Sequence, residues 1–355
     1  MKAMLLAAGL GERMLPITRV VPKPLVPVLG RPLAPQILAR LAAEGIDEAV
    51  INLHHLPRPL RDAFGDGVTL GLSALHYSVE EEQLLGTGGG LAHAAAHLKG
   101  AGTILVRNSD FLADIPLSQV VASHLRSGCP ATIVVAPHRA GYTRVALDDA
   151  HRVTAFGDNA GGSHLFTGYH LIEETVLDRI PAEGPSDIVR GVYFGFAAEG
   201  RLNAYVHDGF WWEFGDPREY LEGSMRVIAL PAERRIRLGD FDVVRPIGSA
   251  IAAIGAGADL TAAGIELAGT LAIGMGVMVG ERAKLEDTVV MPEAWIGPGS
   301  SLCRCIVGPG TEIPMHFEAE ESLIVTDPDP EAALSPGIER VAGLLVRRFA
   351  ARAAQ

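Results

Sequence analysis

A pair of glycines and two cations stand close together near the start of the chain. In LAAGLGERMLPITRVVPKPL, Gly9 and Gly11 follow a short apolar run, Arg13 comes two residues after Gly11, and Lys23 stands between two prolines. Glycines let main-chain N–H groups approach an anion, and a guanidinium and an ammonium each bind phosphate oxygens. The prolines restrict the backbone and so help to aim Lys23. We therefore predict a loop that binds a polyphosphate.

This loop differs from two familiar glycine-rich phosphate loops. Gly9 and Gly11 are followed by Glu12-Arg13-Met14, which excludes the G-x-x-x-x-G-K-[ST] loop of NTPases. The third glycine of a dinucleotide fingerprint would fall at Met14, and its acidic residue further on is missing. The loop must therefore bind its anion in another way.

Two further pairs of candidate site residues stand at the predicted ends of strands or helices. Asn108 and Asp110 follow the apolar run TILV, and Thr87 and Gly88 lie in LGTGGG, where a helix is predicted to begin. In an open α/β sheet, ligands bind outside the carboxyl ends of the strands. A carboxylate there can hold Mg²⁺, which bridges phosphate oxygens. A lone aspartate at a strand end would more often be simply solvated, but the neighbouring motifs favour the metal role.

The elements that must position these residues alternate along the first half of the chain. MKAMLLAA, EAVINL and GTILVRNSD read as strands, while LAPQILARLAAEGI and GTGGGLAHAAAHL have the apolar spacing of helices. Alternating strands and helices predict an α/β fold with a mostly parallel sheet, covered by helices on both faces.

The composition changes at about Ile247, where aliphatic residues begin to recur every six positions between glycines and small polar residues. Ile273, Val279 and Leu285 illustrate the period. It is typical of a parallel β-helix, which we predict over residues 247–325. Hexapeptide-repeat proteins are often acyltransferases, which use a histidine of the coils as general base. This chain has no histidine between His207 and His316, so its coils lack that base. A structural or oligomerising role is the better interpretation.

The tail, GIERVAGLLVRRFAARAAQ, is predicted to end in an amphipathic helix with Ile338, Val341, Leu345 and Phe349 on one side. The expected division is a catalytic domain over 1–230, a linker over 231–246, the β-helix over 247–325 and a tail over 326–355. Since the repeats offer no catalytic group, a chain cut near Ala232 is expected to keep its chemistry and lose its native assembly, a homo-oligomer formed through the C-terminal region.

Several motifs together match a family. The stretch A-A-G-x-G-E-R-M-x-P-[IL]-T followed by P-K-P-L-V-P-V, then LGTGGG, NSD and GFWWEFGDPREYLEG, resembles sugar-1-phosphate nucleotidyltransferases over most of residues 1–225. The first ninety residues resemble N-acetylmuramate-1-phosphate uridylyltransferases. NSD, the GFWWEFGDP stretch and the β-helix are more similar to mannose-1-phosphate guanylyltransferases. The resemblance implies a Rossmann-like domain with a mixed, mostly parallel sheet, followed by a short left-handed β-helix of hexapeptide repeats.

The resemblance also assigns roles to residues. Arg13 and Lys23 would be catalytic, and Asp110 and Glu213 would bind Mg²⁺, although the family has aspartate where this chain has Glu213. The usual Glu-Lys-Pro segment before Gly168 is replaced here by FGDNAGG. The substrate-binding positions implied by the resemblance are Leu6, Ala8, Gly9, Gly11, Thr87, Gly88, Asn108 and Gly168.

The reaction that the resemblance implies transfers a nucleotidyl group from a nucleoside triphosphate to a sugar 1-phosphate, giving an NDP-sugar and pyrophosphate, as in mannose-1-phosphate guanylyltransferases. Two alternatives remain: an N-acetylmuramate- or hexose-1-phosphate uridylyltransferase, and a catalytically silent homologue that binds NDP-sugar and regulates a partner.

Composition limits the partners. The 355 residues carry a formal charge of −12, which argues against a nucleic-acid surface. No apolar run approaches the ~20 residues of a membrane helix, and the start lacks the pattern of a signal peptide. We expect a cytoplasmic protein without membrane or nucleic-acid partners.

Overall fold

The structure is a computed structural model that describes residues 1–241 and 243–350. Its contacts divide the chain into two compact units. Unit 1 comprises Met1–Leu10 and Ile37–Trp212, and unit 2 comprises Gly11–Gln36 and Glu213–Gln355. The boundary falls inside the glycine loop, between Leu10 and Gly11. The division into segments ending at 230, 246 and 325 stays a prediction.

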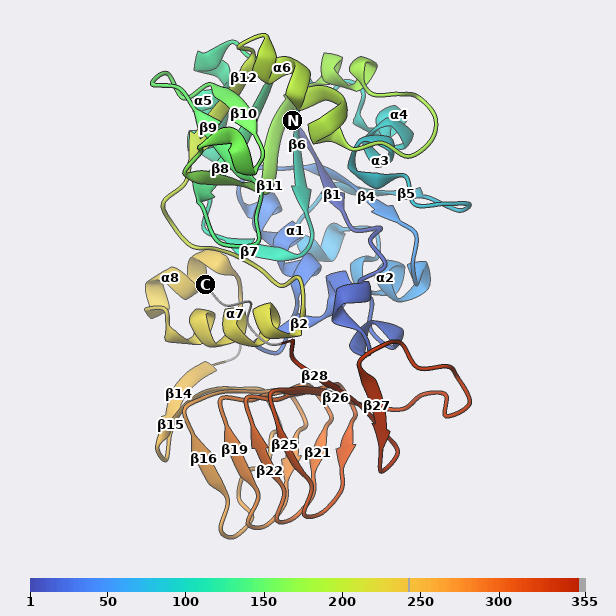
Figure 1. Ribbon diagram of the computed structural model, residues 1–355, viewed down its shortest axis with the longest axis vertical. Helices are drawn as coiled ribbons and strands as arrows, with labels where there is room; N and C mark the ends of the chain where they lie inside the picture. Colours follow the sequence, from blue (N-terminus) through green and yellow to red (C-terminus); the bar gives the residue numbers. More distant parts are fainter. Residues whose placement is uncertain (242, 351–355) are drawn as a thin grey trace. The chain divides into compact units, whose positions relative to one another are not determined.

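Unit 1 is built on a nine-stranded mixed sheet (Figure 1). Its main path has the order β10-β9-β11-β6-β1-β4-β5, and β8 joins β12 to β11. Strands β10 and β11 run against the others, so the predicted mixed, mostly parallel sheet is confirmed. The strands are β1 (Lys2–Leu6), β4 (Glu48–Leu53), β5 (Ala74–Val79), β6 (Thr103–Asn108), β8 (Ala131–Pro137), β9 (Arg144–Leu147), β10 (Val153–Phe156), β11 (His164–Glu173) and β12 (Leu202–Val206).

Helices connect these strands, and their sequences account for where they end. The helix α5 buries Leu117, Val120 and His124 on one side and ends at Gly128, whose φ of +62° suits glycine. The other helices in this part are α1 (Leu33–Ala43), α2 (Pro57–Phe64), α3 (Gly86–His93), α4 (Ala95–Leu98) and α6 (Phe194–Ala198), while α5 spans Leu117–Ser127.

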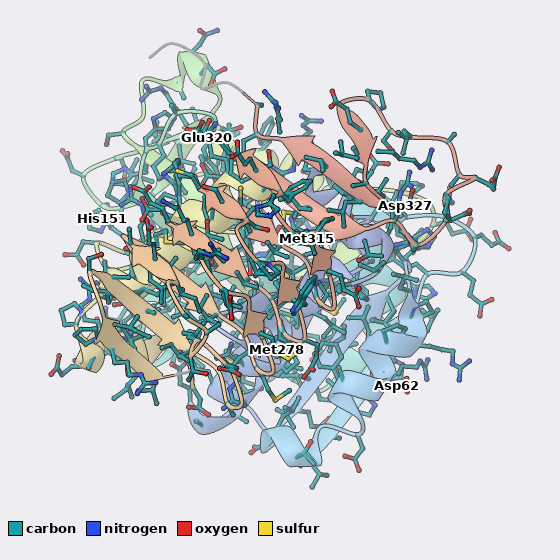
Figure 2. The ribbon with its side chains drawn as sticks, turned by 90° about the horizontal axis from the view of Figure 1, so that it is seen from below. Asp62, His151, Met278, Met315, Glu320 and Asp327 are labelled. Atoms are coloured by element: carbon teal, nitrogen blue, oxygen red, sulfur yellow. The ribbon has the colours of Figure 1, made fainter. Side chains whose placement is uncertain are left out.

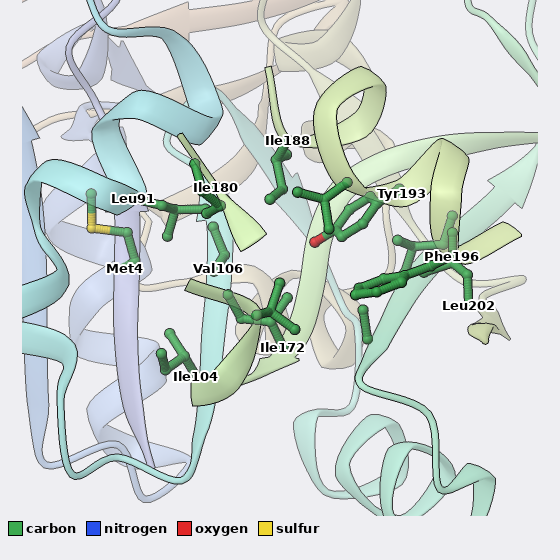
Figure 3. Close-up of a cluster of buried hydrophobic side chains, with 14 of the residues drawn as sticks. Met4, Leu91, Ile104, Val106, Ile172, Ile180, Ile188, Tyr193, Phe196 and Leu202 are labelled. Atoms are coloured by element: carbon green, nitrogen blue, oxygen red, sulfur yellow. The ribbon is translucent and has the colours of Figure 1, made fainter. Parts of the chain in front are cut away.

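The core of unit 1 lies along the central strands. Figure 3 shows Met4 of β1, Val106 of β6 and Ile172 of β11 in one buried cluster, with Tyr193 and Phe196 further along. Met4 and Val106 are fully buried. Strands covered on both faces carry runs of apolar residues, as β1 does in AMLL and β6 in ILV. This core fixes the carboxyl ends of both strands, from which the predicted site residues extend.

Unit 2 contains the coils after Ala250. Parallel strands stack in register in three sheets (Figure 1), so that Ile273, Val290, Val307 and Ile324 form one buried column. The strands are β14 (Val243–Ile247), β15 (Ala250–Ile254), β16 (Glu266–Ala268), β17 (Thr270–Ile273), β18 (Met278–Val279), β19 (Lys284–Glu286), β20 (Val289–Val290), β21 (Trp295–Ile296), β22 (Ser301–Cys303), β23 (Ile306–Val307), β24 (Glu312–Ile313), β25 (Glu318–Glu320) and β26 (Ser322–Thr326). These strands fit a β-helix.

One corner of each coil is shorter than a strict six-residue repeat requires. Asp287, Arg304 and Glu321 occupy this corner in successive coils, with φ of +44°, +51° and +45°. A left-handed residue turns the chain within fewer positions. The step from Leu285 to Val290 therefore breaks the six-residue spacing seen from Ile273 to Leu285.

The predicted C-terminal helix is wrong. Residues 338–348 form a hairpin of β27 (Ile338–Val341) and β28 (Leu344–Arg348), and β28 also pairs with β26. Ala342 and Gly343 between them have φ of +52° and +79°, the conformation of a two-residue hairpin turn. The hairpin covers an edge that β26 would otherwise leave open. The end of the predicted helix, residues 351–355, lies outside the described residues.

Unit 2 also contains α7 (Pro217–Ala229) and α8 (Ala232–Leu238). The coils carry exposed methionines: Met275, Met278 and Met315 are each more than half exposed. Figure 2 labels the last two. Within the described residues, no helix combines the length and the apolar character that crossing a membrane requires.

A buried histidine predicts how unit 1 responds to acid. Burial lowers the pKa of His170 from 6.5 to about 3, and its Nδ1 hydrogen-bonds the Tyr193 hydroxyl. The folded protein holds this ring neutral, whereas the unfolded chain takes up a proton as the pH falls below 6.5. The stability from this residue is therefore present above pH 6.5 and is lost as the pH falls toward 3.

We expect His170→Gln to reduce, by about 2 kcal/mol, the fall in the free energy of unfolding between pH 7 and pH 5. Urea titrations at both pH values measure it. The matched control is Asn159→Gln, at an exposed residue of unit 1 that does not titrate, which should keep the wild-type pH dependence. An unchanged pH dependence in His170→Gln would contradict the assignment.

Candidate active site

The glycine loop begins after Leu6, at the end of β1, and a side chain of the neighbouring strand bonds to its main chain. Ala8 is buried and Gly9 is exposed. The N–H of Ala7 donates to Oδ1 of Asn52, at 2.7 Å. Asn52 stands near the carboxyl end of the neighbouring strand β4, so two adjacent strand ends are tied together.

The same asparagine connects this loop to the LGTGGG segment. Nδ2 of Asn52 donates to Oε1 of Glu80 at 2.7 Å, and Oε2 of Glu80 accepts from the N–H of Leu85 at 2.8 Å. Asn52 and Glu80 are each only 3% exposed. Sequence reasoning missed both. The available signal was an asparagine inside the apolar strand EAVINL and an acidic residue directly after the next strand.

The LGTGGG segment packs against residues 184–188. The N–H of Gly88 donates to the carbonyl of Ser186 at 2.9 Å, and Oγ1 of Thr87 accepts from the N–H of Ile188 at 3.0 Å. A Cβ on Gly88 would lie 2.6 Å from Oγ of Ser186, so the close approach requires glycine. The glycine-rich helix start therefore serves close packing against a partner segment that no sequence pattern indicated.

The structure brings Asn108 and Gly168 together. Gly168 has a φ of +76°, and a Cβ there would lie 2.6 Å from Nδ2 of Asn108. Asn108 ends β6, and Asp110 follows on the turn after it, half-buried. Gly168 and the residues at the end of β6 thus share one edge of the unit 1 sheet.

A buried arginine holds the turn that carries Asp110. Arg107, 4% exposed, donates to the carbonyls of Asn108 at 3.2 Å and Phe111 at 2.9 Å. Its guanidinium also lies over the Phe111 ring, 4.2 Å from the centroid. Burial lowers the pKa of Arg107 to about 10, so it stays charged at neutral pH. No role was predicted for Arg107, although an arginine inside the apolar strand TILVRN is unusual.

In unit 2, the loop folds back so that Gly11 lies against Lys23. Gly11 has a φ of +69°, and a Cβ there would lie 3.1 Å from Cβ of Lys23 and 2.8 Å from Cγ2 of Thr18. Oγ1 of Thr18 donates to the carbonyl of Gly11 at 3.0 Å. Pro22 and Pro24 are buried while Lys23 is half-buried. The proline frame therefore anchors the backbone on both sides of this lysine.

The structure pairs Arg13 with Glu213. Nη2 of Arg13 lies 3.0 Å from Oε1 of Glu213, and the two side chains are 65% and 19% exposed. Gly215 lies against this pair, since a Cβ there would be 2.5 Å from Oε1 of Glu213. Glu213, which was expected to bind a metal ion, thus forms an ion pair with Arg13, which was predicted to be catalytic.

The predicted metal ligands do not form a ready-made cluster. Among residues 1–241 and 243–350, no three His, Cys, Asp or Glu side chains gather as a metal site. Mg²⁺ commonly uses one or two carboxylates and completes its shell with water and substrate phosphates. The half-buried Asp110 carboxylate at a strand end fits this mode, whereas Glu213 would first have to part from Arg13.

The family follows from a comparison with known proteins. Residues 2–229 match the model of the family described as nucleotidyl transferase. This chain belongs to that family. The recognition of a sugar-1-phosphate nucleotidyltransferase from its motifs is confirmed, and the chain is an enzyme of nucleotidyl transfer.

The similarity to named relatives extends beyond the catalytic part and includes the coils. The mannose-1-phosphate guanylyltransferase of Mycobacterium tuberculosis is 31% identical over 88% of this chain and 80% of its own length. Mannose-1-phosphate guanylyltransferase 1 of Arabidopsis thaliana is 29% identical over 91% of this chain and 86% of its own. A crystal structure of HddC from Yersinia pseudotuberculosis aligns with a TM-score of 0.54 at 18% identity, over 63% of this chain and 98% of that one, which shows the shared fold.

We expect Asn52→Leu to destabilise this nucleotidyltransferase by about 2 kcal/mol or more, because it removes the hydrogen-bonding partner of the Ala7 N–H and of Oε1 of Glu80. Urea unfolding measures the loss. Asn159→Leu, at an exposed asparagine of unit 1, is the matched control and should change the free energy of unfolding by less than about 0.5 kcal/mol. Equal effects in the two variants would show that the Asn52 bridge contributes nothing.

Proposed function

We propose that this nucleotidyltransferase transfers GMP from GTP to mannose 1-phosphate, giving GDP-mannose and pyrophosphate. The observation that carries the proposal is the match to mannose-1-phosphate guanylyltransferases over about nine-tenths of the chain. The match continues through the coils, beyond the residues that the family model covers.

The chemistry explains which residue types the reaction needs. The attacking oxygen belongs to a phosphate monoester whose second pKa is about 6, so it is largely dianionic at neutral pH and needs no general base. It attacks the α-phosphorus, and pyrophosphate leaves. Catalysis therefore consists of bringing two polyanions together and stabilising the charge of the transition state.

Arg13 and Lys23 are the proposed cations. In this proposal Arg13 contacts the β- and γ-phosphates and stabilises the leaving pyrophosphate, and Lys23 meets the α-phosphate or the sugar phosphate. The Arg13–Glu213 ion pair is consistent with this role, because the exposed guanidinium of Arg13 can leave the Glu213 carboxylate and bind phosphate oxygens when the nucleotide binds. Gly9 and Gly11 let the main chain approach the nucleotide, beside Leu6 and Ala8.

Asp110 is the proposed Mg²⁺ ligand, with Glu213 as a second ligand once Arg13 has turned to phosphate. When bound, the ion would neutralise phosphate charge and orient the reacting groups. Arg107 supports this role because its two bonds to main-chain carbonyls hold the turn that presents Asp110.

Thr87 and Gly88 are proposed to contact the guanine, and Asn108 and Gly168 the sugar side. A cavity of about 590 Å³ in unit 1, of a size that suits a small ligand, supports the placement of the sugar. Phe166, close before Gly168, lines it together with Gly157 and Asp158 of the FGDNAGG segment. This segment would then replace the missing Glu-Lys-Pro in binding the sugar.

The coils are proposed to be a left-handed β-helix of hexapeptide repeats through which copies of the chain associate. The exposed Met275, Met278 and Met315 support an apolar contact there, since exposed apolar patches mark interfaces. Light scattering of the full chain tests it. A cytoplasmic location stays a prediction from the sequence.

Pyrophosphate release from a matrix of nucleoside triphosphates and sugar 1-phosphates tests the substrates. We expect the highest kcat/KM for GTP with mannose 1-phosphate. A preference for UTP with N-acetylmuramate or hexose 1-phosphate would instead support the uridylyltransferase. No turnover with any pair, despite binding of GDP-mannose, would support the silent regulatory homologue.

We expect Asp110→Asn to lower kcat about 10²-fold or more, because it removes the charge proposed to anchor Mg²⁺ while keeping the side-chain shape. The matched control is Asp178→Asn, at an exposed aspartate of unit 1, which should keep wild-type turnover. Near-normal turnover by Asp110→Asn at limiting magnesium would remove this residue from the site.

A further inference from the structure

The C-terminal hairpin of unit 2 bonds directly to the main chain of the Arg13 loop. Nη1 of Arg347, in β28, donates to the carbonyl of Arg13 at 2.9 Å and to the carbonyl of Leu15 at 2.8 Å. These residues are more than 330 positions apart in the chain. One guanidinium nitrogen therefore ties two carbonyls of the loop to the last described strand.

Other contacts attach the same loop and its surroundings to the C-terminal part. Nη2 of Arg19 donates to the carbonyl of Ala333 at 3.0 Å. Arg218, in the first turn of α7, binds both oxygens of Glu321 at 3.1 Å. Arg218 holds the pKa of Glu321 below its usual value. The segments that carry Arg13 and Glu213 are thus both anchored to coil or hairpin residues.

Arg347 is suited to this task by its chemistry. A short helical turn, Glu12–Met14, contains Arg13, and the carbonyls at such turns lack regular partners. A planar guanidinium has several donors in a fixed geometry, so it fixes the backbone more precisely than an ammonium would. The side chain of Arg13 stays 65% exposed, while its main chain is held.

We propose that Arg347 is a positioning residue for nucleotidyl transfer, and that the C-terminal hairpin is part of the machinery that aims Arg13 at the triphosphate. The inference rests on the proposed function of Arg13. It reverses the expectation that a chain cut near Ala232 keeps its chemistry, because such a chain lacks Arg347, Ala333 and Glu321.

The test compares three variants of the full-length chain with the wild type. Arg347→Ala removes both bonds, and Arg347→Lys keeps the charge but not the guanidinium geometry. Arg348→Ala is the matched control, because the neighbouring Arg348 is exposed and its guanidinium has no hydrogen-bonding partner among the described residues. Hydrogen exchange of the peptide covering residues 11–25 and steady-state kinetics with GTP and mannose 1-phosphate are measured for each.

For Arg347→Ala we expect faster exchange in residues 11–25 and a fall in kcat of about 10-fold or more, with the KM for mannose 1-phosphate changed by less than about 3-fold. Arg347→Lys should restore part of the slow exchange and part of kcat. Arg348→Ala should match the wild type in both measurements. Wild-type kcat and wild-type exchange in Arg347→Ala would overturn the inference. So would an equal loss in Arg348→Ala.

The exchange measurement separates this inference from the proposed function. It needs no substrate, so faster exchange of residues 11–25 confined to the Arg347 variants would be seen even if the wild-type chain had no activity with GTP and mannose 1-phosphate. An inactive wild type would contradict the proposed function. Faster exchange with unchanged kcat would show that Arg347 holds the loop without serving the reaction, and would contradict the positioning role.

Discussion

Main-chain carbonyl groups in the loops of this protein need donors, and buried or half-buried arginines supply them. Arg107 bonds the carbonyls on either side of Asp110, and Arg347 bonds those of Arg13 and Leu15. A loop that leaves a sheet loses the regular ladder of bonds, so its shape depends on such side chains. Asp110 and Arg13 stand on loops whose main chains are held in this way, so the backbone that carries each of them has a defined shape.

Charge is the second constraint. The chain carries a formal charge of −12, yet the proposed reaction joins two polyanions. The cations that bind them must therefore be local and well held. Arg13 is paired with Glu213 in the structure, which gives the guanidinium a partner that phosphate oxygens can replace. Lys23 is held by its buried proline neighbours. Both cations thus belong to a short segment of unit 2.

Local patterns in the sequence predicted much of the fold and part of the site. EAVINL is β4 residue for residue, and Gly11 and Lys23 meet because the loop between them is framed by proline and glycine. What sequence could not predict depends on distant partners. Asn52 bridges Ala7 and Glu80, and Arg347 reaches Arg13, through contacts that only the folded chain creates. The C-terminal hairpin was missed because its helical spacing is overridden by a two-residue turn at positive φ.

The proposed function requires that Arg13, Lys23, Asp110 and Thr87 contact the nucleotide sugar or its metal ion. A crystal structure of the chain with GDP-mannose and Mg²⁺ tests it most directly. We expect Arg13 or Lys23 within hydrogen-bonding distance of the diphosphate, Asp110 on the metal and the guanine beside Thr87. GDP-mannose bound away from Arg13, Lys23 and Asp110, or bound without metal at Asp110, would contradict it.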